Sequence, residues 1–418
     1  MIRSSIHQFK RIIVVRGIFR RLMLLWTISM LLVLSGCWDL RYLDKLGVVL
    51  ALGVDVDPKE KQKLKLTVQV VLPQNVAAES KGGSGGTSVT TFSESGDTLF
   101  EAIRKMTTKT SRRLFFSHTQ MLVISDKMAK KDIYSLVDLI ERNPDIRTDI
   151  SVVIARDSTA SDLLQLTTQM EPIPINQMHE MIEVNQTSYA TSYAVLVKDI
   201  TKLMGRGQQQ AVLPTMRIEG DKGEMHSIEN VNNIPAGAIP VLSTMAVFRE
   251  GKLIGYLSPK ESRGLSWLHD KVKSTVVKLA CPGSEGKLIV EVHESSTELK
   301  VKRGLNDMPI VEVKVRLVGG VQEIMCPGLE VSEESVLVEI GNLMSKAVEE
   351  EIESAIRRIQ TGMRSDAIGW GRETYLQQPT IWKRIESDWQ AVFPKVKSEV
   401  SCSTVITGSG GRSESIVK

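Results

Sequence analysis

The sequence lacks the residue patterns on which many enzyme classes depend. It contains no His-Glu-x-x-His or His-x-x-x-His string, no Gly-x-x-x-x-Gly-Lys-Ser/Thr phosphate loop and no Gly-x-Gly-x-x-Gly after a predicted strand. The six histidines are scattered at His7, His118, His179, His226, His269 and His293. His179-Glu180 precedes apolar residues on an ordinary predicted helix, so we interpret it as a surface pair. We therefore expect no catalytic residue, no metal site and no cofactor.

Cysteine is also scarce, and its spacing excludes a zinc site. The four cysteines, Cys37, Cys281, Cys326 and Cys402, form no Cys-x-x-Cys pair. Cys281 and Cys326 each begin a Cys-Pro-Gly string, and an oxidising compartment would allow them to bridge. We favour the alternative that they are small buried apolar residues. The bridged state stays open.

The sequence has no apolar run long enough for a permanent membrane span. The longest runs from Leu22 to Leu34 and is broken by Thr27 and Ser29. As a helix, thirteen residues extend ~20 Å, short of the ~30 Å hydrocarbon layer. Arg20-Arg21 precede the run and small residues follow it, which is the organisation of a secretory signal. We expect residues 1–36 to be a signal peptide.

The signal ends at Leu34-Ser35-Gly36-Cys37, which resembles the bacterial lipobox. In a lipobox the cysteine sulfur receives a diacylglycerol and the cysteine becomes the new N-terminus. Ordinary signal cleavage requires a small residue where Leu34 stands. Two or more acyl chains give stable membrane anchoring. Cys37 is therefore the predicted lipidation site, and membrane lipid is a predicted partner.

Acidic residues are absent from the leader, and this explains the net charge. Residues 1–36 carry six Lys or Arg and no Asp or Glu, so the remainder carries a formal −2 against +4 for the whole chain. A mature body near neutrality has no general attraction to nucleic acid. We expect no nucleic-acid partner.

The mature chain predicts a fold of the α+β class, with mixed α/β character. Alternating or buried apolar patterns predict strands at 47–56, 63–72, 115–124, 150–155, 244–248, 252–256, 287–292, 297–302, 311–318 and 396–406. Helical patterns predict helices after residue 98, at 133–140, around 163–166, at 175–204 and at 333–360. This implies several domains, three small ones, with mixed sheets and packed helices.

Composition shifts suggest where the domains divide. Residues 37–220 form a predicted N-terminal α/β region of one or two domains, with a flexible glycine-rich loop at 80–88 that lacks the lysine of a phosphate loop. The polar stretch 219–239 is the predicted boundary. A C-terminal α+β domain spans 240–406, and 407–418 is a polar tail.

The aromatic content is only 5%, yet three tryptophans fall within twenty residues at Trp370, Trp382 and Trp389. Trp382 and Trp389 lie seven positions apart on a predicted helix, so both can reach one core. We interpret them as core residues.

Eight strings, taken in order, resemble the Ger(x)C lipoproteins of endospore-forming bacteria. They occupy 36–41 (GCWDLR), 49–55 (VLALGVD), 113–118 (RLFFSH), 142–147 (RNPDIR), 245–248 (MAVF) with 255–257 (GYL), 366–371 (DAIGWG), and 382–389. Ile368 and Trp370 replace the phenylalanines expected in the glycine motif. The resemblance covers nearly the whole mature chain.

The resemblance implies a function without bond-making. Ger(x)C proteins are C-type subunits of spore germinant receptors, held on the outer surface of the spore inner membrane. They assemble with an A-type subunit and a polytopic B-type subunit into a complex that responds to nutrients. The family fold consists of three α/β domains, consistent with the predicted elements.

Two other classes remain as alternatives. A lipid-anchored solute-binding protein would require a deep cleft between two lobes. A lipoprotein hydrolase would require a convergent nucleophile and base, for which the sequence offers no candidates.

Overall fold

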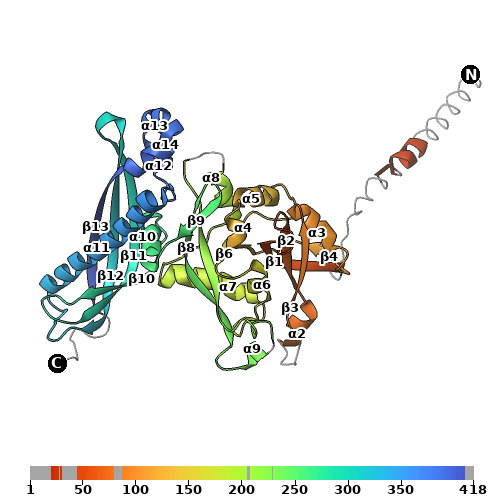
Figure 1. Cartoon of the computed structure of the whole chain (residues 1–418), viewed down its shortest axis with the longest axis horizontal. Coiled ribbons are helices and arrows are strands. Elements are labelled where there is room, and N and C mark those ends of the chain that lie inside the picture. The colour runs from red at the N-terminus through yellow and green to blue at the C-terminus, as the bar shows by residue number, and fades with distance from the viewer. Residues whose placement is uncertain are drawn as a thin grey trace, which may run out of the picture. The chain divides into compact units, whose positions relative to one another are not determined.

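The computed structural model describes residues 20–27, 29–30, 45–79, 87–204, 208–227 and 229–409. Two compact units divide the chain at Leu46/Gly47. In the first unit, residues 20–27 are helical. Over the described ranges, no helix is both long and apolar enough to cross a membrane. The second unit, Gly47–Lys418, contains two β-sheets with helices packed on them (Figure 1).

The first sheet is mixed, with strand order β3-β2-β1-β5-β6-β7-β8-β9 and with β4 paired to β1. β1, β5, β6 and β7 are parallel, and antiparallel strands flank them on both sides. Its strands are β1 (Leu46–Val56), β2 (Leu64–Val71), β3 (Val89–Gly96), β4 (Arg113–Phe115), β5 (Met121–Ser125), β6 (Ser151–Ala155), β7 (Val212–Gly220), β8 (Ala238–Arg249) and β9 (Lys252–Tyr256).

Helices cover both faces of this sheet, and β1 contributes to both cores. Val49, Leu52 and Val54 pack with α3 and α5, whereas Leu50 and Ala51 pack with α6 and α7. The pairing to β2 shifts between Val49 and Ala51, and such a bulge moves the side-chain alternation by one residue. The helices of this region are α2 (Pro73–Glu79), α3 (Leu99–Met106), α4 (Asp126–Ala129), α5 (Ile133–Glu141), α6 (Ala160–Gln165), α7 (Pro174–Ser188), α8 (Val197–Leu203) and α9 (Glu229–Asn232).

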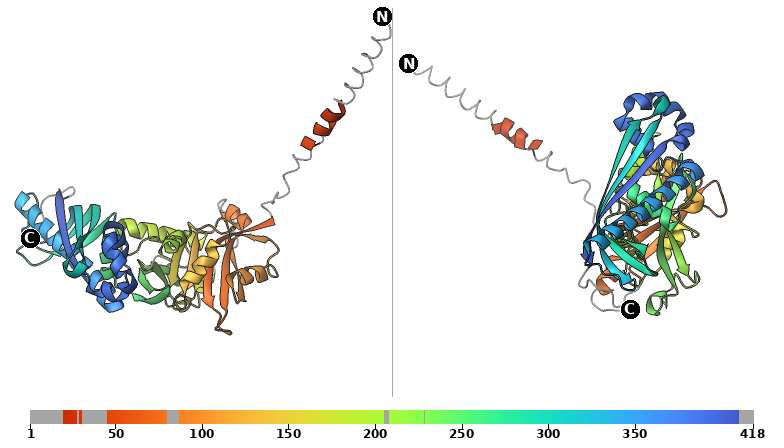
Figure 2. Two further views of the ribbon diagram at one scale, coloured as in Figure 1. Left: turned by 90° about the horizontal axis from the view of Figure 1, so that it is seen from above. Right: turned by 90° about the vertical axis from the view of Figure 1, so that its left-hand side faces the viewer.

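The second sheet has the order β10-β11-β12-β13, with only the β12–β13 pair parallel. The helix α11 runs along one face of it (light blue in Figure 2) and packs against α10. The elements are α10 (Pro259–Leu268), β10 (Thr275–Ala280), β11 (Lys287–Arg303), β12 (Pro309–Met325), α11 (Glu334–Arg357), a π-helical segment Arg358–Met363, α12 (Trp370–Gln377), α13 (Pro379–Ile385), α14 (Trp389–Val392) and β13 (Lys397–Ser409).

A third apolar core joins the two sheets. It contains Val212, Met245 and Val247 of the first sheet together with most buried residues of β10 to β13 and of α11. The predicted α+β class with mixed sheets is confirmed.

Two predicted elements are broken in the structure. The helix predicted at 175–204 ends at Ser188, because Asn185 binds the backbone that follows it. The Asn185 carbonyl accepts hydrogen bonds from the N–H groups of Tyr189 and Ala190, and its side chain accepts one from the Ser192 N–H. Ala190 then adopts a positive φ of 56°, which no α-helix continues. The strand predicted at 115–124 is interrupted by a turn in which the Thr119 N–H binds the Phe116 carbonyl.

The predicted domain boundary falls between two strands that pair in the first sheet. Residues 221–237 link β7 and β8, which pair with each other from Val212↔Val247 to Gly220↔Ala238. Asn230, fully buried, bonds both the N–H and the carbonyl of Ala238 and holds this connection in place. β13 continues to Ser409, three residues into the predicted polar tail. Most of the predicted glycine-rich loop, residues 80–86, lies outside the described residues. The boundaries themselves stay predictions.

The favoured interpretation of two cysteines is wrong. Cys281 and Cys326 form a disulfide with their Cα atoms 5.6 Å apart. Cys281 follows β10 and Cys326 follows β12, the two strands on either side of β11, so the sheet itself brings them together. Cys402 on β13 is a free thiol.

Candidate functional site

The predicted lipidation site, Cys37, lies outside the described residues, so lipidation stays a prediction. The predicted absence of catalytic, metal and cofactor residues also stays a prediction. Three polar centres and one cavity in the described part of the chain are the candidates for a functional site.

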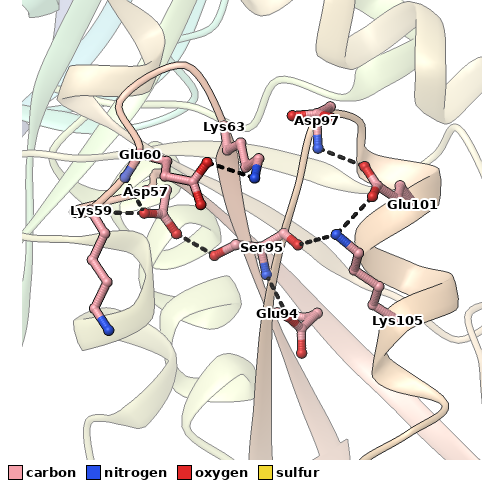
Figure 3. A network of polar contacts seen from close by, with 9 residues as sticks. All are labelled: Asp57, Lys59, Glu60, Lys63, Glu94, Ser95, Asp97, Glu101 and Lys105. Atoms are coloured by element: carbon pink, nitrogen blue, oxygen red, sulfur yellow. Dashed lines mark hydrogen bonds and ion pairs between the residues drawn. The ribbon is translucent and has the colours of Figure 1, made fainter.

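The first centre joins the ends of β2 and β3 to α3 (Figure 3). Asp57 accepts hydrogen bonds from the backbone N–H groups of Lys59 and Glu60, both at 2.7 Å, and from the Ser95 hydroxyl. The Ser95 bond is the main reason that the pKa of Asp57 falls to about 2, and the Glu60 N–H adds to it. Such bonds favour the charged carboxylate. This network fixes the turn that joins β1 to β2.

The same centre orients α3. Thr98 caps the helix by accepting from the Glu101 N–H, and the Glu101 side chain accepts from the Asp97 N–H. Lys105, one turn further, pairs with Glu101 at 2.7 Å and also reaches the Ser95 carbonyl. Thr98 is thus a side-chain N-cap, and the Glu101 carboxylate, held by a lysine, binds the N–H of the residue before the cap. The arrangement serves the fold.

The second centre is a buried carboxylate in the 366–371 motif. The oxygens of Asp366 accept from the backbone N–H groups of Gly369, Trp370 and Gly371 and from the indole of Trp389, at 2.7 to 3.0 Å. Burial raises the pKa of Asp366 to about 6, against the lowering effect of these four donors. Asp366 therefore ties the start of α12 to α14.

Gly369 and Gly371 are required by this geometry. Gly369 has a φ of 92°, and a Cβ on Gly371 would stand 2.6 Å from the Gln208 carbonyl oxygen. The motif thus also brings α12 against the chain that leads into β7. Aromatic rings pack around this motif. The ring centroids of Trp382 and Trp389 lie 5.3 Å apart in an edge-to-face arrangement, and the Phe393 ring contacts those of Trp370 and Trp389. All four lie in the core, as the predicted role of the tryptophans requires.

The third centre is a buried ion pair between α10 and α11. Arg263 binds Glu351 through two guanidinium nitrogens, and the Trp267 indole donates to the same carboxylate at 3.1 Å. Only 14% of the Arg263 side chain and 8% of the Glu351 side chain are exposed. Gly264 allows the close approach, since a Cβ there would stand 2.2 Å from the Glu351 carbonyl oxygen.

A cavity of about 840 Å³ lies between segments that belong to the two sheets. Its lining includes Tyr193, Gln208, Gln209, His269, Lys271 and Arg372. The His269 Nε2 lies 3.1 Å from the Ile368 carbonyl, which can only accept, so Nε2 carries the proton. Nδ1 then accepts from the Tyr193 hydroxyl at 2.7 Å. Burial lowers the pKa of His269 to about 4, so the imidazole is neutral near pH 7.

The remaining histidines are not brought together in the described residues. His118 contacts the ring of Phe115, and His226 lies 3.2 Å from the Gln165 carbonyl. His179, Glu180 and Glu183 on α7 have ligand atoms within 4.8 Å of one another. They are neighbouring side chains on one helix surface, with both glutamates exposed, and nothing buried points to a metal there.

Sequence reasoning missed the Asp366 and Arg263–Glu351 centres. The string at 366–371 was recognised as a family motif, but it carries no capping signal for Asp366, because the N-cap position of α12 is Gly369. For Arg263 and Glu351, 88 residues apart, no local signal exists.

Comparison with known proteins places the chain. The family model described as "Spore germination protein N-terminal domain" matches residues 39–218, and "Spore germination B3/ GerAC like, C-terminal" matches residues 243–410. Spore germination protein KC of Bacillus subtilis (strain 168) is 29% identical over 390 residues, which is 92% of this chain and 95% of that protein. Spore germination protein B3 of the same organism is 22% identical, over 92% of this chain and 97% of that protein.

The fold agrees with these matches. The crystal structure of the GerBC protein is similar with a TM-score of 0.51 at 17% sequence identity, covering 85% of this chain and 96% of that chain. Two germination domains in one α+β chain define the class: a spore germination protein. Within that class the chain belongs to the GerAC-like family, and the resemblance to Ger(x)C proteins is confirmed. Neither the domain descriptions nor the relatives' names specify a catalytic activity.

Proposed function

We propose that this protein is a non-catalytic, lipid-anchored subunit of a spore germinant receptor, acting through protein–protein contacts at the outer face of the spore inner membrane. The observation that carries the proposal is the ordered pair of family matches, which together span 39–218 and 243–410. Full-length coverage of relatives named as germination proteins supports it. The A-type and B-type receptor subunits are the proposed partners.

The anchor would act by confinement. Nine positions separate Cys37 from Leu46, the first residue of β1. A fully extended chain of that length spans about 30 Å, so a lipid on Cys37 keeps the folded unit within that distance of the bilayer. Confinement raises its effective concentration for other proteins of the same membrane. The three polar centres, each satisfied by partners within the chain, serve to hold a rigid surface for such contacts.

The test is genetic, in a strain that carries this receptor alone. Deleting the protein should abolish the response to the receptor's nutrients, while germination triggered downstream of receptors proceeds. Cys37→Ala should block lipidation and release or mislocalise the chain. Cys402→Ala is the matched control, because it removes a free thiol without touching the anchor. A normal nutrient response after deletion would rule the proposal out.

The cavity of about 840 Å³ favours a second candidate, a lipid-anchored solute-binding protein. Its lining mixes the charged side chains of Lys271 and Arg372 with the amides of Gln208 and Gln209, a polar setting suited to a small polar solute. Saturable binding of one nutrient, lost on Arg372→Ala and kept on a change outside the cavity, would support it over the first candidate.

A further inference from the structure

Residues 104–118 carry charge of one sign. The segment contains Arg104, Lys105, Lys109, Arg112 and Arg113 and no Asp or Glu. It begins in α3, passes through residues 107–112 and enters β4. The structure shows which of these five basic side chains pair with an acidic residue.

The two lysines are neutralised within the fold. Lys105 pairs with Glu101 at 2.7 Å, and Lys109 pairs with Glu94 at 2.7 Å. Lys109 also donates to the Ser93 carbonyl, and Lys105 donates to the Ser95 carbonyl. Figure 3 shows Lys105 turned toward β3 for this purpose. Lysine therefore serves the α3–β3 packing.

The three arginines differ from the two lysines in this respect. None of Arg104, Arg112 and Arg113 forms an ion pair with any residue that the structure describes. Arg104 and Arg113 are exposed and Arg112 is half-buried. Arg104 instead stacks on Phe100, one turn earlier on α3, with its guanidinium carbon 4.8 Å from the ring centroid. Phe100 is 52% exposed, so its ring reaches the surface beside Arg104.

Arg112 and Arg113 lie where the folded unit begins, and Arg104 lies on the neighbouring helix α3. β4 pairs with β1, and a Cβ on Gly47 would contact Leu114 at 3.5 Å and Arg112 at 3.8 Å. Figure 1 shows α3 and β4 close to one another beside β1, β2 and β3. The start of β1 is also the point at which the chain arrives from Cys37, at most about 30 Å of extended chain away. A lipid on Cys37 would hold this part of the surface near the bilayer.

We propose that Phe100, Arg104, Arg112 and Arg113, the arginine surface, lie on the anionic headgroups of the membrane that holds the Cys37 lipid. The inference rests on the proposed anchor and adds an orientation to it. Each basic side chain near an anionic bilayer favours binding by about fivefold, and an exposed aromatic ring inserts at the headgroup level. A single acyl chain or a flexible tether sets distance only, whereas a charged face sets which side of the protein meets the lipid.

The test uses the full lipidated chain on vesicles. In a Cys402→Ala background, Ser111→Cys places a reporter thiol at an exposed site beside Arg112, and Ser403→Cys places a control thiol on exposed β13. Labelling by a bulky water-soluble maleimide is compared on neutral phosphatidylcholine vesicles and on vesicles that also contain phosphatidylglycerol. Labelling of the reporter thiol should slow at least about fivefold on the anionic vesicles, and labelling of the control thiol should not change.

Charge reversal supplies the second arm. Arg112→Glu with Arg113→Glu should restore fast labelling of the reporter thiol on anionic vesicles, as should 1 M salt, which screens the attraction. Lys127→Glu with Lys131→Glu is the matched control: it reverses the same charge in the other small basic group and should leave the protection intact.

The outcomes separate the two proposals. Flotation with both vesicle types but equal labelling of the reporter thiol on them overturns the arginine surface and leaves the anchor standing. Flotation with neither type overturns both. Protection that occurs only when the A-type and B-type subunits are present would assign the arginine surface to a protein partner and overturn its assignment to lipid.

Discussion

Asp366, which is buried, and His269, which is half-buried, make opposite contributions to stability in the same pH range. Asp366 has a pKa raised to about 6, so the folded state holds its proton after the unfolded state has lost it. His269 has a pKa lowered to about 4, so the unfolded state takes up a proton that the folded state refuses. The contribution of Asp366 to the free energy of unfolding therefore falls as the pH rises toward its folded-state pKa. The contribution of His269 falls as the pH drops toward its folded-state pKa.

The Asp366→Asn variant isolates the first effect. The amide loses acceptors for four N–H donors, so the variant is less stable than the wild type at pH 4. Between pH 4 and pH 6 the wild type loses about 2 kcal/mol to the raised carboxyl pKa, and the variant does not. The deficit of the variant should therefore shrink by about that amount. Urea unfolding at pH 4, 5 and 6 measures it, and a constant deficit would contradict it.

The His269→Gln variant should show the reverse dependence. Glutamine keeps one donor and one acceptor for Ile368 and Tyr193 but cannot be protonated. As pH falls from 6.5 to 4, the wild type should lose roughly 2 kcal/mol relative to the variant, less than the full shift implies because the residue is partly exposed. The same urea series checks the sign. A deficit of the variant that grows toward pH 4 would show that the folded state accepts the proton.

At the scale of elements, the α10–α11 contact depends on one buried pair. Glu351→Ala leaves the Arg263 guanidinium buried without its carboxylate, which costs about 3–5 kcal/mol. Glu350, the adjacent residue, pairs with Lys260 at 3.8 Å on the surface, with both side chains more than half exposed. Glu350→Ala should change stability by less than about 0.5 kcal/mol. Equal effects of the two substitutions in chemical denaturation would show that burial does not matter here.

The disulfide stabilises the second sheet at one end. Cys281 and Cys326 are 45 positions apart, so the bond restricts a long loop in the unfolded chain. The Cys281→Ala/Cys326→Ala variant should lose about 2–4 kcal/mol, and a reductant should destabilise the wild type but not the variant. Cys402→Ala controls for the loss of a half-buried thiol. An unchanged melting temperature in the double variant would contradict the assignment.

Elements with a long, periodic pattern were predictable. The helix expected at 333–360 is α11, Glu334–Arg357, because apolar residues at helical spacing, such as Ile340, Ile352 and Ile356, specify one buried face. The hairpin around Glu250-Gly251 was also predicted correctly. Both residues adopt a positive φ, as a tight two-residue hairpin turn requires. The break after Ser188 was not, because Asn185 competes for the backbone only once the following residues have turned.

The polar centres were harder to predict from the sequence, because their partners lie far apart along the chain. Glu351 reaches Arg263 across 88 positions, and Cys281 reaches Cys326 only because β11 separates β10 from β12 in the sheet. Such partners depend on sheet order, and sheet order is a property of the whole fold. Cys37 is the opposite case: the lipobox is local, so the sequence carries the entire prediction and the described structure adds nothing to it.

At the scale of the whole molecule, the third core decides whether the two germination domains behave separately. Val212, Met245 and Val247 belong to the first sheet but pack among residues of the second. Trp267, Trp370, Trp382 and Trp389 lie in that same core, so their fluorescence reports it, whereas far-UV circular dichroism reports the helices and strands of both regions. A shared core of this kind couples the unfolding of both sheets.

Unfolding should therefore be a single transition, with coincident midpoints by fluorescence and by circular dichroism. Met245→Ala, which empties a fully buried site on β8, should lower both midpoints together by the equivalent of about 2–5 kcal/mol. Leu163→Ala, in the core on the α6 side of the first sheet, is the control: that core contains no tryptophan among its described residues, yet the substitution should shift the fluorescence midpoint as well. If Leu163→Ala shifts only the circular dichroism signal, the two sheets unfold independently. The predicted division into separate domains would then hold in energetic terms as well.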